Sequence, residues 1–184
     1  MLSHDALGLD SVMLDEARAY LRIEADAEDT SLGAILTAAI SHAENFTGQM
    51  LIRRNARQVI SAGSGWRRLA VTPVIEVISA TGIPADGATF LLPDNAWQAE
   101  IDRNDDAYIR IRRPGAAGRV EVTVEAGLAE DWDGLPEALR LAILRLTGHL
   151  YTSRDDAQDA GPPAAVAALL RPWRRMRLSD GAKR

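Results

Sequence analysis

The stretch RVEVTVE (Arg119–Glu125) alternates apolar and polar side chains residue by residue, and YIRIR (Tyr108–Arg112) does the same. Because successive side chains of a β-strand point to opposite faces, this alternation predicts two strands with one buried and one solvated face. Strands of this kind are typical of an antiparallel sheet. The turn-forming run PGAAG (Pro114–Gly118) joins the two segments.

Shorter β-type runs extend this region toward the N-terminus and are separated by residues that favour turns. The Gly-Ser-Gly run at Gly63–Gly65 predicts a hairpin connection, and Gly82 is expected to break the strand that begins at Val74. The predicted strands are Gln58–Ser61, Arg68–Val71, Val74–Thr81, Thr89–Leu92 and Trp97–Ile101. Together they predict a small antiparallel β-domain, either a sandwich or a barrel-like insert.

Helical periodicity precedes and follows this insert. Apolar spacing predicts one helix over Leu14–Arg22 and a second that is capped by Asp26 or Asp29 and ends at Thr47. A long helix is expected to begin at Pro136, and a short one spans Ala164–Leu170. The predicted fold class is therefore α+β. Two N-terminal helices and a long C-terminal helix form a helical bundle, with an inserted small antiparallel β-domain and a C-terminal docking arm.

The expected domain organisation follows from these elements. The chain begins with a start that is expected to be disordered and that contains His4. The expected parts are an N-terminal helical hairpin (1–52), the β insert (53–128), the C-terminal helix that completes the helical core (129–153), and a flexible linker, short helix and basic tail (154–184).

Charge is distributed unevenly along the 184 residues. The formal net charge is −5, which argues against a chain whose whole surface binds nucleic acid. Residues 1–52 carry nine acidic and two basic residues, whereas Arg171–Arg184 holds six basic residues and one acid. A basic end of this kind is typical of an interaction tail.

The sequence contains no recognisable catalytic, cofactor-binding or metal-binding arrangement. Cysteine is absent, which excludes disulfides, thiol nucleophiles and cysteine-ligated metals. His4, His42 and His149 are far apart and lack metal-ligand spacing, so they are interpreted as surface or interface residues. Pairs of acidic residues lie in predicted turns, where Asp is favoured for backbone reasons. We therefore expect a non-enzymatic protein without cofactor.

The basic tail is the one feature of the sequence that indicates binding. Leucine, tryptophan and methionine alternate with arginine there, and Trp and Arg are enriched at the energetic centres of interfaces. One hypothesis is a docking arm for an acidic or grooved partner. The alternative is a nucleic-acid-binding module that uses arginine–phosphate contacts and tryptophan stacking. The residues concerned are Leu169, Leu170, Arg171, Trp173, Arg174, Arg175, Met176, Arg177 and Leu178.

The long C-terminal helix has two apolar faces. One stripe contains Leu139, Ile143 and Leu146, and the second is formed by Leu141, Leu144 and Tyr151. A helix with two apolar faces is either central in its own core or shared with another subunit.

The order of these motifs resembles the head–tail connector (adaptor) proteins of long-tailed phages, prophages and gene transfer agents. The resemblance covers nearly the whole chain. It rests on several short motifs that occur in the same order as in the family. These motifs are LDEARAYLRI (Leu14–Ile23), TAAISHAENFTGQML (Thr37–Leu51), Pro73-Val74 with Val77, VEVTVEAGL (Val120–Leu128), Leu135-Pro136, HLYTSRDD (His149–Asp156) and LLRPWRRMRL (Leu169–Leu178).

This resemblance implies a structural role in a virion. Connector proteins of this family assemble as a ring, commonly of twelve copies, between the portal and the tail. The ring extends the channel for double-stranded DNA and docks a tail-side connector or tail terminator protein. The resemblance implies that the C-terminal segment binds the portal and that Leu141, Leu144 and Tyr151 contribute to the ring interface. The expected location is the head–tail junction of a phage-like particle that is assembled in the bacterial cytoplasm.

No membrane association is expected from the sequence. No segment reaches the roughly 18 apolar residues without charge that a membrane-spanning helix needs. The N-terminal residues also lack the basic and apolar regions of a secretory signal.

Overall fold

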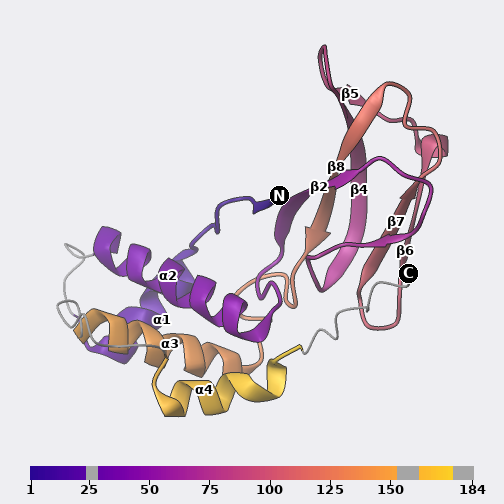
Figure 1. The fold of residues 1–184 in the computed structure, drawn as a ribbon. Helices are drawn as coiled ribbons and strands as arrows, with labels where there is room; N and C mark the ends of the chain where they lie inside the picture. Colours follow the sequence, from indigo (N-terminus) through magenta and orange to yellow (C-terminus); the bar gives the residue numbers. More distant parts are fainter. Residues whose placement is uncertain (24–28, 153–161, 176–184) are drawn as a thin grey trace. The chain divides into compact units, whose positions relative to one another are not determined.

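The computed structural model describes residues 1–23, 29–152 and 162–175 (Figure 1). Residues 153–161 and 176–184, in the predicted linker and basic tail, lie outside this part. In chain order the elements are β1 (Leu2–His4), α1 (Ser11–Leu21), α2 (Asp29–Thr47), β2 (Arg54–Ser61), β3 (Arg67–Arg68), β4 (Val74–Pro84), β5 (Phe90–Leu91), the 3-10 turn η2 (Asp94–Ala96), β6 (Trp97–Ile101), β7 (Ala107–Ile111), β8 (Ala117–Ala126), α3 (Glu137–Thr152), α4 (Ala164–Leu170) and the 3-10 turn η3 (Arg171–Trp173).

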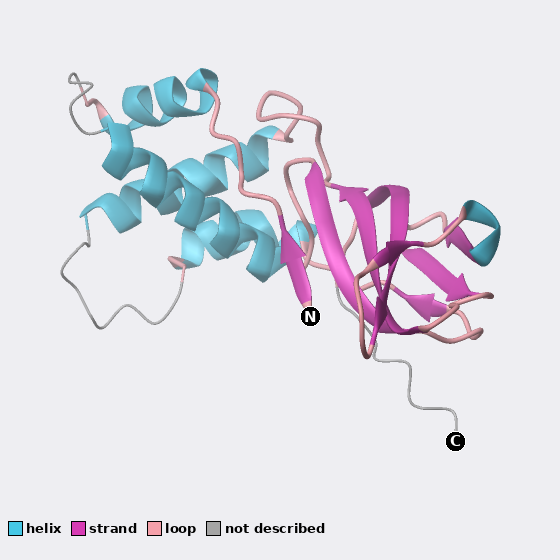
Figure 2. Cartoon of the chain, turned by 90° about the horizontal axis from the view of Figure 1, so that it is seen from above, coloured by secondary structure: helices cyan, strands magenta, loops and turns pink. Residues whose placement is uncertain are grey.

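The predicted α+β class is confirmed by helices and antiparallel sheets that fall into two compact units (Figure 2). The β-unit consists of Met1–Leu7 and Met50–Asp131. The helical unit consists of Gly8–Gln49 and Trp132–Arg184. The helical unit is therefore assembled from chain segments on both sides of the β-unit in the sequence.

The larger sheet of the β-unit has the strand order β1-β2-β8-β4-β5. Strand β8 lies in its centre, antiparallel to β2 on one side and to β4 on the other. The alternating segment that predicted this strand buries Val120, Val122 and Val124, while Glu121 and Glu125 remain at least partly accessible. The predicted alternation between a core face and a solvated face is therefore confirmed for β8.

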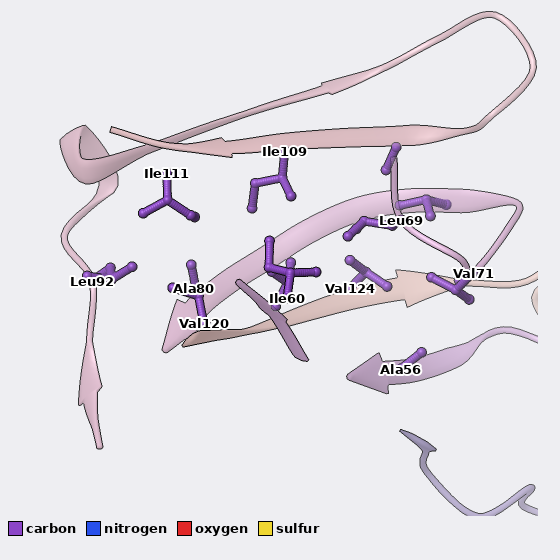
Figure 3. Packing of buried hydrophobic residues seen from close by; sticks show 14 of the residues in the cluster. Ala56, Ile60, Leu69, Val71, Ala80, Leu92, Ile109, Ile111, Val120 and Val124 are labelled. Carbon is purple, nitrogen blue, oxygen red and sulfur yellow. The ribbon is translucent and has the colours of Figure 1, made fainter. Parts of the chain in front are cut away.

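The smaller sheet has the order β3-β7-β6 and closes the core of the β-unit. Figure 3 shows Ile109 and Ile111 of β7 extending toward Ile60, Ala80 and Val120 of the five-stranded sheet. All five side chains are buried in one hydrophobic cluster. The two sheets therefore form two layers around a shared apolar core.

One expected connection in the β-unit is wrong. The Gly63–Gly65 run does not form a hairpin, because β2 pairs with β1 and β8 whereas β3 pairs with β7 in the other sheet. The predicted turn at Pro114–Gly118 does join β7 to β8, although these two strands belong to different sheets. Turn residues permit a reversal of the chain but do not determine which strand becomes the hydrogen-bonded neighbour.

Gly82 does not break its strand, contrary to expectation. It lies inside β4, where it pairs with Phe90 of β5 and Val120 of β8. A Cβ atom at this position would lie 2.8 Å from Cζ of Phe90, so the glycine makes room for the aromatic ring. Glycine in a strand interior commonly marks such a close approach.

The N-terminal residues are ordered, which corrects the expectation of a disordered start. His4 is the last residue of β1, the edge strand that pairs with β2. The backbone N–H of Asp5 donates to the carbonyl of Asn55 at 2.9 Å, and Arg57 donates to the Asp5 carboxylate at 2.6 Å. Backbone pairing and this ion pair together hold the start of the chain on the sheet.

The helical unit is built around the buried faces of α1, α2 and α3. Helix α1 begins at Ser11, before the predicted Leu14, because the Asp10 carboxylate caps it by accepting from the Met13 N–H at 2.8 Å. Trp132 is completely buried, and its indole N–H donates to the Glu16 carboxylate at 2.6 Å. These contacts join the N-terminal helices to the segment that follows the β-unit.

Candidate partner-binding segment

The C-terminal segment contains the predicted docking residues and begins with α4. Pro163 precedes this alanine- and leucine-rich helix, which has the predicted boundaries Ala164–Leu170. Val166 and Leu170 are buried, and α4 packs against α3 and α2. Burial of these two side chains fixes α4 to the helical unit.

Residues 173–175 run along the C-terminal end of α2. The side-chain amide of Gln49 donates to the Trp173 carbonyl at 2.8 Å, and the Arg175 N–H donates to the Thr47 carbonyl at 2.8 Å. Gln49 and Thr47 are both buried. The last carbonyl groups of a helix have no N–H partner within the helix, and the Thr47 carbonyl is one of them. The Arg175 N–H supplies the missing hydrogen-bond donor.

Arginine side chains around this contact differ in their surroundings. The Arg174 guanidinium lies 5.8 Å from the centroid of the Phe46 ring, within the range of a cation–π interaction. Arg171 and Arg174 are exposed, whereas Trp173 and Arg175 are half-buried. The segment therefore presents cationic side chains on a backbone that is held against α2.

The structure divides the predicted docking residues into three groups. Leu170 is fully buried and Leu169 half-buried, so the leucines contribute to packing within the chain. Arg171, Trp173, Arg174 and Arg175 retain accessible surface. Met176, Arg177 and Leu178 lie outside the described residues. Part of the predicted arm is thus a packed element of the helical unit.

The second apolar face of α3 is only partly accessible. Leu141 is 37% exposed and Tyr151 is half-buried, while Leu144 is buried. The first stripe, which contains Leu139, Ile143 and Leu146, is buried as well. Helix α3 is thus central in its own unit and still leaves Leu141 at the surface.

Sequence reasoning missed the residues that receive the C-terminal segment. In the sequence, Thr47 and Gly48 mark only the end of the second helix, Phe46 belongs to the apolar stripe of that helix, and Gln49 carries no binding signal. Gly48 adopts a φ of 71°, and a Cβ there would lie 3.5 Å from the Arg175 carbonyl oxygen. The Thr-Gly stop was the only local signal, since the contacting residues are more than 120 positions apart.

Acidic and histidine residues do not converge on a metal-binding arrangement in the described ranges. No group of three or more histidine, cysteine, aspartate or glutamate residues there is placed to hold a metal ion. Asp102 accepts backbone N–H groups from Asn104 and Asp106, and the Asp106 bond makes the largest contribution to lowering the pKa of its carboxyl group. Asp106 itself pairs with Arg68 at 2.5 Å. These carboxylates stabilise a turn.

Among the helices that the structure describes, none is both long and apolar enough to cross a membrane.

Comparison with known proteins agrees with the predicted connector resemblance. The family described as "Phage gp6-like head-tail connector protein" matches residues 11–74, which extend from α1 into the start of β4. No curated protein matches the sequence.

Solved structures match nearly the whole chain. A chain from the neck of an empty GTA particle computed with C6 symmetry is 27% identical, with a TM-score of 0.76. A chain from the virion of a native gene transfer agent (GTA) particle is 29% identical, with a TM-score of 0.73. A chain from the neck of a native GTA particle computed with C12 symmetry is 28% identical, with a TM-score of 0.71. Each match covers 98% of both chains.

These matches agree with the connector resemblance and the structural role expected from the sequence. The matched family is described as one of head–tail connectors, and the solved structures cover 98% of the chain. Residues 11–74 therefore match the phage gp6-like head–tail connector family, and the chain as a whole shares its fold with chains of GTA particles.

Proposed function

We propose that this chain is a structural component of the neck of a phage-like particle, where copies form a ring between the portal and the tail. The observation that carries the proposal is the match over 98% of the chain to neck chains of GTA particles. Those necks were computed with C6 and C12 symmetry, which supports a ring of twelve copies. The ring extends the DNA channel and docks a tail-side connector or tail terminator protein.

The portal-binding surface in this proposal is the C-terminal segment. Its backbone is held by Gln49 and Thr47, so the Arg171 and Arg174 side chains project from a fixed position. A pre-positioned segment loses less conformational entropy on binding than a free tail does. The residues beyond Arg175 continue from this anchored point and include the remaining predicted docking residues, Met176, Arg177 and Leu178.

Ring formation in this proposal uses the outer face of α3. Leu141 is the accessible apolar residue on that face, and Tyr151 is half-buried near the end of the helix. Leu144 lies beneath the surface and supports the helix from within. An exposed leucine on a helix whose other side is already packed is suited to a contact between copies.

Portal docking can be tested by sedimentation of the chain with purified portal rings. Deletion of Leu169–Arg184 is a poor test because it removes the buried Leu170 along with the arm. A chain that ends after Arg175, and the Arg171→Glu/Arg174→Glu double variant, leave Val166 and Leu170 in place. Both variants are expected to lose co-sedimentation with the portal by about tenfold or more.

The matched control for this test is Arg103→Glu, which reverses the charge of an exposed arginine in the β-unit. It is expected to sediment with portal rings as the unaltered chain does. Normal docking by both C-terminal variants would show that another surface binds the portal. Self-association is tested separately with Leu141→Glu, which is expected to weaken it, and with His42→Glu on the exposed face of α2, which is not.

A further inference from the structure

On the outer face of the three-stranded sheet, opposite the hydrophobic core, polar and aromatic side chains form a row across the strands. Arg110 of β7 lies directly opposite Gln98 of β6. The β3–β7 register, in which Arg67 opposes Ile109, places Trp66 beside Arg110 from the other side. The Arg110 guanidinium stacks 4.6 Å from the centroid of the Trp66 ring, which is 39% exposed.

Two guanidinium groups in this row converge on one neutral oxygen atom. Gln98 Oε1 accepts from Nε and Nη2 of Arg110 at 3.1 and 2.6 Å, and from Nη2 of Arg112 at 2.6 Å. In the part of the chain that the structure describes, neither guanidinium forms an ion pair with a carboxylate. We call Trp66, Gln98, Arg110 and Arg112 the arginine face.

Other arginines of the same unit have acidic partners. Arg57 pairs with Asp5 at 2.6 Å and Arg68 pairs with Asp106 at 2.5 Å. In the arginine face, the nearby Glu100 carboxylate instead accepts from the Gln98 side-chain amide at 3.4 Å. The amide thus stands between the carboxylate and the two cations, whose mutual repulsion a bound anion would relieve.

The position of the two arginines is fixed by the backbone. Arg110 lies within β7, and the N–H groups of Arg112 and Arg113 both donate to the Ala96 carbonyl, at 2.7 and 3.0 Å. Arg110 is half-buried, held between the Trp66 ring and the Gln98 amide. A site on a strand with side chains already stacked and hydrogen-bonded is pre-organised for a ligand.

We propose that the arginine face binds the phosphate groups of double-stranded DNA. A phosphodiester offers several oxygen atoms around one negative charge, so it can accept from both guanidinium groups where a neutral amide oxygen now does. One face of the Trp66 ring is covered by Arg110, which disfavours stacking of an unpaired base there and favours contact with a duplex backbone. This inference goes beyond the connector role, because a ring can surround DNA without a specific contact.

The test measures binding of the full chain to a fluorescent DNA duplex by anisotropy, over a series of salt concentrations. The unaltered chain is expected to bind at low salt. Arg110→Gln/Arg112→Gln is expected to weaken binding by about tenfold or more and to reduce the salt-dependence slope by about two, since each lost phosphate contact removes about 0.9. The charge-matched control Arg103→Gln/Arg119→Gln removes two exposed arginines of the same unit and is expected to retain the slope.

A second variant distinguishes loss of the phosphate contacts from a general folding defect. Arg110→Lys/Arg112→Lys keeps both charges but loses the planar fork and the stacking on Trp66. It is expected to bind more weakly than the unaltered chain while retaining most of the salt slope.

Two outcomes would overturn the proposal. One is the absence of duplex binding by the unaltered chain at low salt, or equal binding by the arginine-face and control variants. The other is selective loss of self-association or portal binding by Arg110→Gln/Arg112→Gln, which would assign the face to a protein contact. The portal test does not use these residues, so the connector proposal stands or falls separately.

Discussion

The β-unit and the helical unit reach a stable core by different routes. Apart from the short strand β1, the β-unit comes from one continuous stretch, Met50–Asp131, and its strands are joined by backbone hydrogen bonds. The helical unit combines segments from both sides of that stretch, which are joined by side-chain contacts and by the backbone hydrogen bond from Arg175 to Thr47. Trp132 with Glu16 and Gln49 with Trp173 are examples of such contacts.

This difference bears directly on function. The C-terminal segment proposed to bind the portal is packed on α2, which lies more than 120 residues earlier in the sequence. Its position therefore depends on the integrity of the N-terminal helices. The arginine face, in contrast, depends only on strands within the β-unit. Mutations in the helical unit are therefore expected to affect portal binding, and mutations in the β-unit are expected to affect DNA binding.

Truncation of Trp132 is expected to have the largest effect and to be confined to the helical unit. Trp132→Ala removes a fully buried side chain and leaves the Glu16 carboxylate without its indole partner, at a cost of about 3–5 kcal/mol. Amide hydrogen exchange should show loss of protection in α1, α2 and α3 and retained protection in β8. Trp66→Ala, at an exposed site, is the matched control. Equal loss of protection in both units after Trp132→Ala would contradict the expectation that the two units are stabilised separately.

Replacement of Gly127 tests the β-unit in the same way. Gly127 has a φ of 151°, and an added Cβ would lie 2.4 Å from both the N and Cα atoms of Arg53. Because this clash is with backbone, Gly127→Ala is expected to lower the free energy of unfolding by about 2–4 kcal/mol, as measured by urea denaturation. Gly65→Ala has open space around the new methyl group and should be nearly neutral. Equal stability of the two variants would show that the backbone relaxes freely there.

Removal of the Gln49 amide tests the attachment of the C-terminal segment. Gln49→Ala deletes the buried donor to the Trp173 carbonyl and is expected to cost about 1–2 kcal/mol. The loss should appear as faster hydrogen exchange in α4 and weaker portal docking, with duplex binding unchanged. His42→Ala, on the exposed face of the same helix, serves as the control. Unchanged exchange in α4 would mean that the buried Val166 and Leu170 hold the segment without this bond.

The smallest effect is expected from acid titration of Asp29 in the helical unit. Arg18 donates to both Asp29 carboxylate oxygens and lowers the pKa of that carboxyl group. Because the pKa of Asp29 is lower in the folded state than in the unfolded state, ionised Asp29 stabilises the folded protein at pH values above the ordinary pKa of aspartate. This stabilisation is lost as the pH falls through the lowered, folded-state pKa. Thermal unfolding between pH 7 and pH 2 should therefore show a slightly smaller acid dependence for Asp29→Asn. An identical pH profile would show that the pair contributes nothing to stability.

The sequence predicted local elements well where periodicity and flanking residues agreed. The boundaries of β6 (Trp97–Ile101) and α4 (Ala164–Leu170) were predicted as found, and α2 ends at the predicted Thr47. Each of these elements has a clear apolar pattern or is bounded by proline, glycine or turn residues. Gly82 was misjudged, because a local rule for glycine does not show that Phe90 packs against it.

Pairing between distant segments could not be predicted in the same way. Nothing near Gly63–Gly65 indicates that β2 and β3 belong to different sheets, since pairing depends on strands far along the chain. The basic, aromatic character of the C-terminal segment was visible in the sequence, but its attachment to Thr47 and Gln49 was not. Those contacts depend on the tertiary structure of the helical unit.

The most direct test of the central claim is an electron cryomicroscopy map of particles produced with this chain. We expect a ring of copies between portal and tail, with residues 171–175 and the chain beyond them against the portal. Absence of the chain from the neck, or a ring whose C-terminal segments face away from the portal, would contradict this account.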